Sequence, residues 1–389
     1  MARRRTTLGM TQLLARCAAR RAHVLTVEAP GYWVVRAETE LRFRARRWCA
    51  ATSPADADVL AVCGVPGPEL SEATGRVWDQ LPGPRVRIDV PDLQTVDSAL
   101  ERAAAELVDI DMHRNDARER IQSPNLSGDH DHADHGRPHQ QDHAQHAHGG
   151  YGEHQHMDHG AMDMAPVGIA LAEGGEDRDG LEMDELHVRV GPVLRYWPAG
   201  LVVRWALHGD VLAGTQAWML DSNLGNCRPP SDLRDGAARH CDHVVDVLEL
   251  AGWPCAATIA RTARDTLLRE PNSARGRSVL DTLHRKLRRS RVLRWSLRDI
   301  ASLTVKDCDG LGLPAALAGD CYDRLLARVD IVRRALSEPL EPNVLRVAAA
   351  GIVDTLPHLV DGLDLATARL LIASLGIDTA PVEAGGRDG

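Results

Sequence analysis

The sequence predicts an N-terminal α/β domain with a parallel sheet and a C-terminal α+β domain with a small antiparallel sheet and a helix bundle, joined by a disordered His-rich linker. Three observations predict this arrangement. In the first 112 residues, apolar runs alternate with amphipathic stretches of helical spacing. Near residue 200, alternating apolar residues flank a Gly-Asp turn signal. Beyond residue 235, apolar residues recur at intervals of three and four to the C-terminal region.

The first domain, residues 1–112, is expected to hold βαβ units. A buried apolar run ends in a Gly-Val-Pro-Gly turn and is followed by a helical stretch and a second apolar run. Such a strand–helix–strand order favours a parallel sheet, because parallel strands need a crossover connection. The predicted elements are strands at 23–27, 34–36, 58–63 and 85–90, and helices at 68–80 and 93–107.

The second domain, residues 181–378, is expected to open with an antiparallel sheet. Residues 186–190 alternate between apolar and polar, and residues 200–212 contain the turn signal Gly209-Asp210. Helices follow, and residues 379–389 form a tail. The predicted helices are 235–251, 254–269, 275–290, 320–337, 342–356 and 365–375.

Residues 113–180 are predicted to be a disordered linker. They are rich in His, Asp, Gly and Gln and have little apolar periodicity. Residues 129–163 carry seven acids and one Arg, a balance of −6 out of the −9 of the whole chain. The folded domains are therefore close to neutral, and net charge says little about what they bind.

The composition predicts a cytoplasmic protein. No stretch approaches the roughly 20 apolar residues that span a bilayer, and Arg16, Arg20 and Arg21 interrupt any apolar core of a signal peptide. The eight Cys are spread without a CxxC pair, which favours free thiols, and Cys17, Cys49 and Cys63 are expected to be buried. The first 50 residues hold 11 Arg against three Glu, but without a nucleic-acid motif we expect a solvated face or a subunit contact there.

Two segments of the first domain resemble the small, B-type subunit of NADH-quinone oxidoreductase (complex I) and of related membrane-bound nickel-iron hydrogenases. Residues 53–66 have the sequence SPADADVLAVCGVP, and residues 77–85 have VWDQLPGPR. These are similar to the family's SPR-x-ADVL-x-V-x-G segment and to its aromatic-D-Q-x-P-x-P segment. The resemblance implies an α/β fold with a final strand after the second segment.

The second domain resembles the large, D-type subunit of the same complexes. Gly191-Pro192 followed by LVVRWALHGDV at 201–211 is similar to that subunit's opening sheet. Residues 319–336 contain GDCYDRLLARVDIVRRAL, similar to its GD-x-x-x-R-x-x-x-R helix. The resemblance implies a fused B–D chain, and we expect Asp320, Arg324 and Arg328 to form buried ion pairs on one helix face.

The cofactor ligands of these families are missing. Where the small subunit holds a cubane iron–sulfur cluster with Cys thiolates, residues 28–36 and 88–94 contain no Cys, so we expect no cluster. The large subunit's GP-x-HP histidine, which lies at the quinone pocket, has no counterpart after Gly191-Pro192. The paired CxxC motifs of nickel-iron hydrogenases are absent, which excludes hydrogenase activity.

A histidine-rich tract at 129–159 is the candidate metal site. It contains ten of the 18 His and three HxH pairs, whose imidazoles suit Ni²⁺, Zn²⁺ or Cu²⁺, while Met157, Met162 and Met164 beside it favour Cu⁺. The helix pair His240 and His243 with Cys241 is a weaker candidate, because no fourth ligand accompanies it. The predicted ligands of the tract are His130, His132, His135, His139, His143, His146, His148, His154, His156 and His159.

Three hypotheses of function follow. The first is a degenerate fused B–D subunit with a structural or accessory role in a membrane-associated redox or ion-translocating complex. Its partners would be the other subunits of that assembly, including antiporter-like membrane subunits, and it would lie at the inner face of the cell membrane without a span of its own. The second is a Ni, Zn or Cu buffer or chaperone that acts through the His-rich tract. The third, an active quinone-reducing subunit with NAD and quinone binding, rests on the resemblance alone, and the missing ligands disfavour it.

Overall fold

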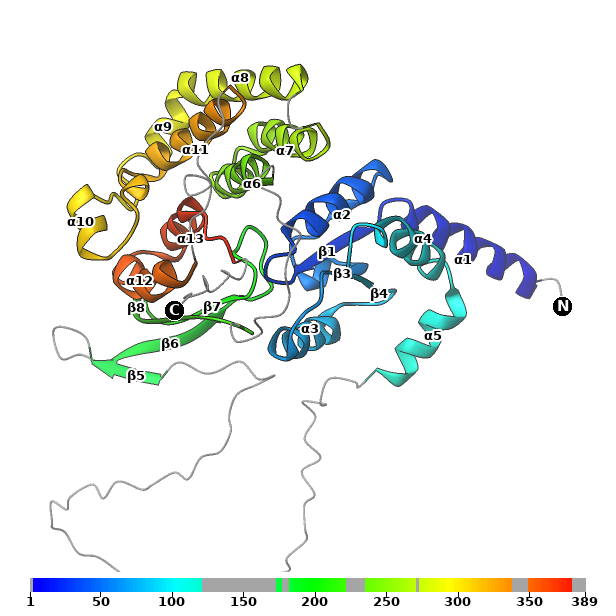
Figure 1. Ribbon diagram of the computed structural model, residues 1–389. Helices are drawn as coiled ribbons and strands as arrows, with labels where there is room; N and C mark the ends of the chain where they lie inside the picture. Colours follow the sequence, from blue (N-terminus) through cyan, green and yellow to red (C-terminus); the bar gives the residue numbers. More distant parts are fainter. Residues whose placement is uncertain are drawn as a thin grey trace, which may run out of the picture.

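The computed structural model confirms the predicted fold class, with one sheet for each domain (Figure 1). The first sheet is parallel and the second is antiparallel, and helices cover both. The predicted histidine-rich tract and most of the predicted linker lie outside the described residues, as does the tail from residue 380. The structure describes residues 3–120, 173–176, 182–221, 235–270, 273–337 and 349–379.

The first sheet has the strand order β2-β1-β3-β4, with every neighbouring pair parallel. Its central strand β3 is apolar and buried along its whole length, as expected for a parallel strand covered on both faces. The strands are β1 (His23–Glu28), β2 (Cys49–Ala50), β3 (Val59–Cys63) and β4 (Val86–Val90).

Helices cover both faces of this sheet. Side chains that alternate along a strand point to opposite faces: Ala61 and Cys63 pack with Phe43 of α2, whereas Leu60 packs with Leu70 of α3. The helices of this part are α1 (Arg3–Ala19), α2 (Trp33–Ala45), α3 (Pro68–Gln80), α4 (Val96–Glu106) and α5 (Ile110–Glu119).

The second sheet has the order β5-β6-β7-β8 and is antiparallel throughout. Alternate residues Leu201, Val203 and Trp205 of β7 are buried in one core with α12 (Ala349–Val360) and α13 (Leu365–Leu375). The strands are β5 (Glu173–Glu176), β6 (Glu182–Val190), β7 (Leu201–His208) and β8 (Val211–Met219).

A helix bundle completes the second domain. Its core brings Val244 and Leu248 of α6 together with Leu283 of α8 and Leu325 of α11. The bundle helices are α6 (Asp235–Leu250), α7 (Pro254–Arg269), α8 (Ala274–Arg289), α9 (Arg291–Leu297), α10 (Val305–Gly310) and α11 (Cys321–Ala335). Of these, α9 and α10 are too short for a periodic pattern and were not predicted.

Several elements differ from the sequence-based expectations. The strand expected at 34–36 is wrong, because these residues belong to α2, where Arg36 forms an i,i+4 ion pair with Glu40. The predicted linker range begins inside α5, which continues the first domain to Glu119, and it contains the short strand β5. The helix expected to end at residue 356 continues to Val360, and the first residues of the expected range, 342–348, lie outside the described residues.

The two domains pack directly against each other. Trp33 and Ala37 of α2 share a buried cluster with Cys241 of α6 and Leu267 of α7, and Figure 1 shows α2 next to these two bundle helices. At a second contact, Asp221 after β8 accepts hydrogen bonds from the first backbone N–H groups of α3, at Glu69 and Leu70, both at 3.1 Å. The two domains therefore form one body with an apolar contact and a polar contact.

Candidate functional site

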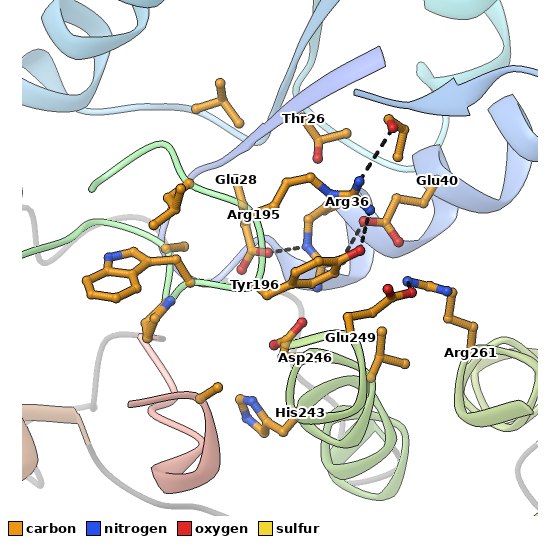
Figure 2. A pocket seen from close by; sticks show the side chains of 18 of the residues that line it. Thr26, Glu28, Arg36, Glu40, Arg195, Tyr196, His243, Asp246, Glu249 and Arg261 are labelled. Atoms are coloured by element: carbon orange, nitrogen blue, oxygen red, sulfur yellow. Dashed lines mark hydrogen bonds and ion pairs between the residues drawn. The ribbon is translucent and has the colours of Figure 1, made fainter. Parts of the chain in front are cut away.

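A cavity of about 420 Å³ lies at the junction of the two domains. The first domain contributes β1, β2 and α2, and the second contributes α6, α7, the β6–β7 loop and the chain around the end of α13. In Figure 2 the labelled charged side chains of α2, α6 and α7 converge on this space with Tyr196. The cavity is the candidate functional site, because it is the place where charged groups of both domains meet.

Helical spacing brings the charged groups to the cavity. Arg36, Glu40 and Arg44 are four residues apart on α2, so they occupy one face of that helix. Asp242 and Asp246 have the same spacing on α6. The two rows meet at the domain junction, where Arg36 of α2 pairs with Asp242 of α6.

The carboxylate of Asp242 is the centre of the network. Arg264 Nη1 donates to its Oδ1 at 2.7 Å, Arg239 Nη1 donates to its Oδ2 at 2.8 Å, and Arg36 Nη2 donates to the same Oδ2 across the domain junction. Burial raises the pKa of Asp242, but Arg36, Arg264 and Arg239 outweigh burial and hold that pKa well below its usual range. Asp242 is therefore a carboxylate that the protein buries together with its counter-charges.

Glu40 makes the reciprocal connection from the first domain. Its Oε1 accepts from Arg36 Nη1 at 2.8 Å, and its Oε2 accepts from Arg264 Nη1 at 3.2 Å. Burial opposes ionisation of Glu40, but the guanidinium groups of Arg36, Arg264 and Arg44 lower the pKa of Glu40 to about 2. The junction is thus held by carboxylates and guanidinium groups that alternate between the two domains.

Asp246 and His243 on α6 differ from Asp242 and Glu40, because burial favours their uncharged forms. Burial, together with the nearby carboxylate of Asp242, raises the pKa of Asp246 to about 8. Burial lowers the pKa of His243, and Arg239 and Arg328 lower it further. At pH 7 both groups are therefore uncharged and line the cavity as hydrogen-bonding groups.

The β6–β7 loop closes one side of the cavity. Arg195 Nη2 donates to the Tyr196 hydroxyl at 2.6 Å, and Arg195 Nη1 donates to the Ala50 carbonyl of β2 at 3.4 Å. Burial raises the pKa of Tyr196 to about 12, so the phenol stays protonated. The loop thereby connects the cavity to the edge strand of the first sheet.

The ion pairs expected for the GD-x-x-x-R-x-x-x-R helix are not formed. Arg324 donates to the backbone carbonyls of Leu317, Gly319 and Ala301, at distances of 2.6–3.2 Å. Arg328 donates to the carbonyls of Ser374 and Leu375 at the end of α13. Both Arg side chains therefore donate to backbone carbonyl groups in place of carboxylates, and Asp320 caps α11 by accepting from Asp323 N.

The smaller metal candidate lies on α6. His240, Cys241 and His243 are all buried, and burial lowers the pKa of His240 to about 3. Across the part of the chain that the structure describes, no group of three or more His, Cys, Asp and Glu side chains is placed to hold a metal ion. The ten ligands predicted between His130 and His159 lie outside that part.

The thiols of the first domain are not all buried. Cys63 is buried in β3, and burial raises its pKa to about 12, so it is an inert thiol. Cys17 and Cys49 are exposed, contrary to the expectation, because α1 and β2 lie at the edge of the fold. No described helix is long and apolar enough to cross a membrane.

Comparisons with protein-family models and with curated proteins found no match for this chain. Within the described residues, the cavity combines charged guanidinium groups with a neutral phenol, a neutral imidazole and a protonated carboxyl group. This arrangement suits binding and charge compensation.

The residues of this network were not predicted from the sequence. A signal was present, because Arg36, Glu40 and Arg44 interrupt a helix whose other positions are largely apolar, and Asp242 and Asp246 do the same on α6. Charged residues at four-residue spacing normally indicate a solvated helix face. Only the contact between α2 and α6 shows that these two faces are buried against each other.

Replacing Asp242 tests the network. We expect Asp242→Asn to lower the free energy of unfolding by about 3–5 kcal/mol, because three guanidinium groups lose their buried counter-charge. Urea unfolding followed by tryptophan fluorescence measures the effect. In the control Asp97→Asn, which removes a half-exposed carboxylate paired with Arg42 and Arg46, the loss should stay below about 1 kcal/mol. Equal losses in the two variants would contradict a central role for Asp242.

Asp246 gives a pH-dependent prediction. Because its pKa is about 8 in the folded chain against an ordinary 3.8, the folded state holds the proton more tightly. Its contribution to stability is complete below about pH 4 and is lost as the pH rises through 8. The difference in free energy of unfolding between Asp246→Asn and wild type should therefore shift in favour of the variant by at least about 1 kcal/mol from pH 5 to pH 9. The measurement is urea unfolding at several pH values, with Asp281→Asn at an exposed position of α8 as the control. A pH-independent difference would refute the shift.

Proposed function

We propose that this chain is a structural or accessory subunit of a membrane-associated redox or ion-translocating complex, a fused counterpart of the small and large subunits of complex I-like assemblies. One observation carries the proposal. Two domains with the expected α/β and α+β folds are joined by the buried contacts of Asp242 and Glu40 with Arg36 and Arg264. Such a junction supports a fused body that acts as one rigid part of a larger assembly.

The state of the charged groups favours a structural role. The carboxylates of Asp242 and Glu40 are occupied by guanidinium groups, and the thiol of Cys63 is buried and protonated. Residues 28–36 and 88–94, where the related small subunits carry cluster ligands, contain no Cys. These features support a subunit that supplies shape and contacts to its complex.

Exposed apolar side chains supply surfaces for partners. Met10, Leu13 and Leu14 on α1 are each more than 60% exposed, and their spacing of three and four places them on one face of the helix. On α9, Val292 and Trp295 are 75% and 83% exposed. Clusters of exposed large apolar side chains mark interaction sites, so both helices are candidates for contact with other subunits.

Purification from the native host tests this proposal. We expect the tagged chain, extracted in a mild detergent, to bring down antiporter-like membrane subunits identified by mass spectrometry. Size-exclusion chromatography of the same sample should show an assembly much larger than 42.4 kDa. Recovery of a lone monomer from both membrane and soluble fractions would contradict the proposal.

A matched pair of variants locates the contact. Leu13→Glu with Leu14→Glu should reduce partner recovery at least tenfold, because two charges would be buried in the interface. Val65→Glu, which changes a single exposed apolar residue elsewhere on the first domain, should leave recovery unchanged. Equal recovery in the two variants would exclude α1 as the contact.

A second candidate function is metal binding by the His-rich tract. The observation that favours it is the run of HxH pairs at His130/His132, His146/His148 and His154/His156, which present imidazoles close enough to chelate without a folded scaffold. The tract would then buffer or deliver Ni, Zn or Cu ions. This role is separable from assembly, because the cavity network and the α1 surface lie elsewhere in the chain.

Metal titration tests the second candidate. We expect the full chain to bind Ni²⁺, Zn²⁺ or Cu⁺ at pH 7.5 in isothermal titration, and binding should weaken below about pH 6, where imidazole is protonated. Deleting residues 129–163 should abolish binding and lower metal tolerance of the host, while partner recovery persists. Millimolar affinity for all three ions, or binding that survives the deletion, would remove this candidate.

A further inference from the structure

The outer surface of α8 and α9 is strongly basic. Within residues 285–298 there are seven Arg or Lys and no Asp or Glu, and all seven side chains are exposed. The nearest acids along the chain are Asp281, which accepts from Arg333 Nε of α11 at 3.0 Å, and Asp299, whose Oδ2 lies 3.8 Å from Arg298 Nε. Even with both acids counted, positive charge dominates this basic surface. Its seven cations are Arg285, Lys286, Arg288, Arg289, Arg291, Arg294 and Arg298.

The fold places these charges on one side of the helix bundle. Ser290 ends α8 and caps α9 by accepting from Leu293 N, so only one residue separates the two helices. Both helices bury their leucines in the core that also contains residues of α6 and α11. Side chains that do not enter this core face away from the bundle, and Figure 1 shows α8 and α9 on its outer side. The buried leucines are Leu283, Leu287, Leu293 and Leu297.

Two large apolar side chains project from this basic surface. Val292 and Trp295 are 75% and 83% exposed, and their spacing of three places them on one face of α9, away from the buried Leu293 and Leu297. Large apolar side chains that are exposed together mark an interaction site. Tryptophan is enriched where a membrane meets water, because its ring is apolar and its N–H is polar.

An open groove at the start of α9 adds a place for an anionic group. Three exposed cations line it, so a phosphate there would accept from guanidinium and ammonium groups. The groove is lined by Trp253, Thr282, Arg285, Lys286, Arg289 and Ser290.

We propose that the basic surface of α8 and α9 docks the protein on an anionic phospholipid membrane, with Val292 and Trp295 inserted among the lipid head groups. Each cation near such a membrane adds attraction, and the apolar pair is buried at the boundary with the hydrocarbon. A bilayer therefore matches the cations and the apolar pair at one place. A nucleic acid would match the charge and stack on Trp295, but it has no apolar layer for Val292. The choice of a lipid surface also rests on the membrane-associated role proposed above.

Vesicle flotation tests the proposal on the full chain. The probes are vesicles of phosphatidylcholine alone and vesicles of phosphatidylcholine with an equal part of phosphatidylglycerol. We expect binding to the mixed vesicles to be at least tenfold tighter than binding to phosphatidylcholine. Raising NaCl from about 0.1 M to about 0.5 M should weaken the binding at least tenfold, because salt screens exposed charges.

Matched variants assign the binding to this surface. Arg288→Gln with Arg289→Gln should weaken binding to the mixed vesicles about tenfold or more, because two cations are lost. The control is Arg76→Gln with Arg102→Gln, which removes two exposed charges from α3 and α4 of the first domain and should bind like wild type. Trp295→Ala should weaken binding about fivefold and leave its salt dependence unchanged, because the cations remain. Circular dichroism checks that each variant is folded.

Three results would overturn the proposal. The first is equal binding to the two kinds of vesicle, or binding to neither. The second is an equal loss in the two double variants, which places the contact elsewhere. The third is tighter binding to a single-stranded DNA oligonucleotide than to the mixed vesicles, lost in Trp295→Ala, which identifies a nucleic-acid surface instead.

The vesicle assay contains no other subunit, so it is separate from the test of the accessory role. Partner recovery in detergent without vesicle binding refutes only the docking surface. Vesicle binding by a chain that recovers no partner refutes only the accessory role.

Discussion

The carboxylate of Asp242 is the interaction on which the domain junction depends. A buried carboxylate is tolerated only when counter-charges and hydrogen bonds compensate for lost hydration. Here Arg36 comes from the first domain and Arg239 and Arg264 come from the second, so the compensation is complete only when the domains are together. The apolar cluster around Trp33 and Cys241 stabilises the contact, whereas the charges fix its geometry, because a displaced junction would separate Arg36 from Asp242.

The sequence predicts the elements far better than the site. Strands such as Val59–Cys63 and helices such as Pro254–Arg269 follow from local apolar periodicity, which one segment reveals by itself. The β-branched pair Val34-Val35 favours a strand locally, but its place in α2 is decided by packing and by the i,i+4 pairs of Arg36. The site could not be predicted because Arg36 and Asp242 are 206 residues apart, and local patterns contain no information on that contact.

At α11 the structure agrees with the expected helix but not with the expected roles of its Arg residues. The GD-x-x-x-R-x-x-x-R segment forms the expected helix, yet Arg324 and Arg328 stabilise carbonyl groups rather than carboxylates. Spacing alone places side chains on one face and does not identify their partners. The same holds for the cavity. By spacing alone the charged residues of α2 and α6 are typical of solvated helix faces, and only the contact between the two helices shows that they are buried (Figure 2).

The cap that Asp221 supplies to α3 has a consequence for the order in which the chain is made. Leu70 N and its acceptor on Asp221 are 151 residues apart, so at 5–20 residues per second the ribosome delivers the cap roughly 8–30 s after the helix. During that interval the first N–H groups of α3 lack this carboxylate acceptor. Asp242, the partner of Arg36, is 206 residues further along the chain and is synthesised later still. The first domain therefore lacks some of its native polar contacts until the second domain has been translated.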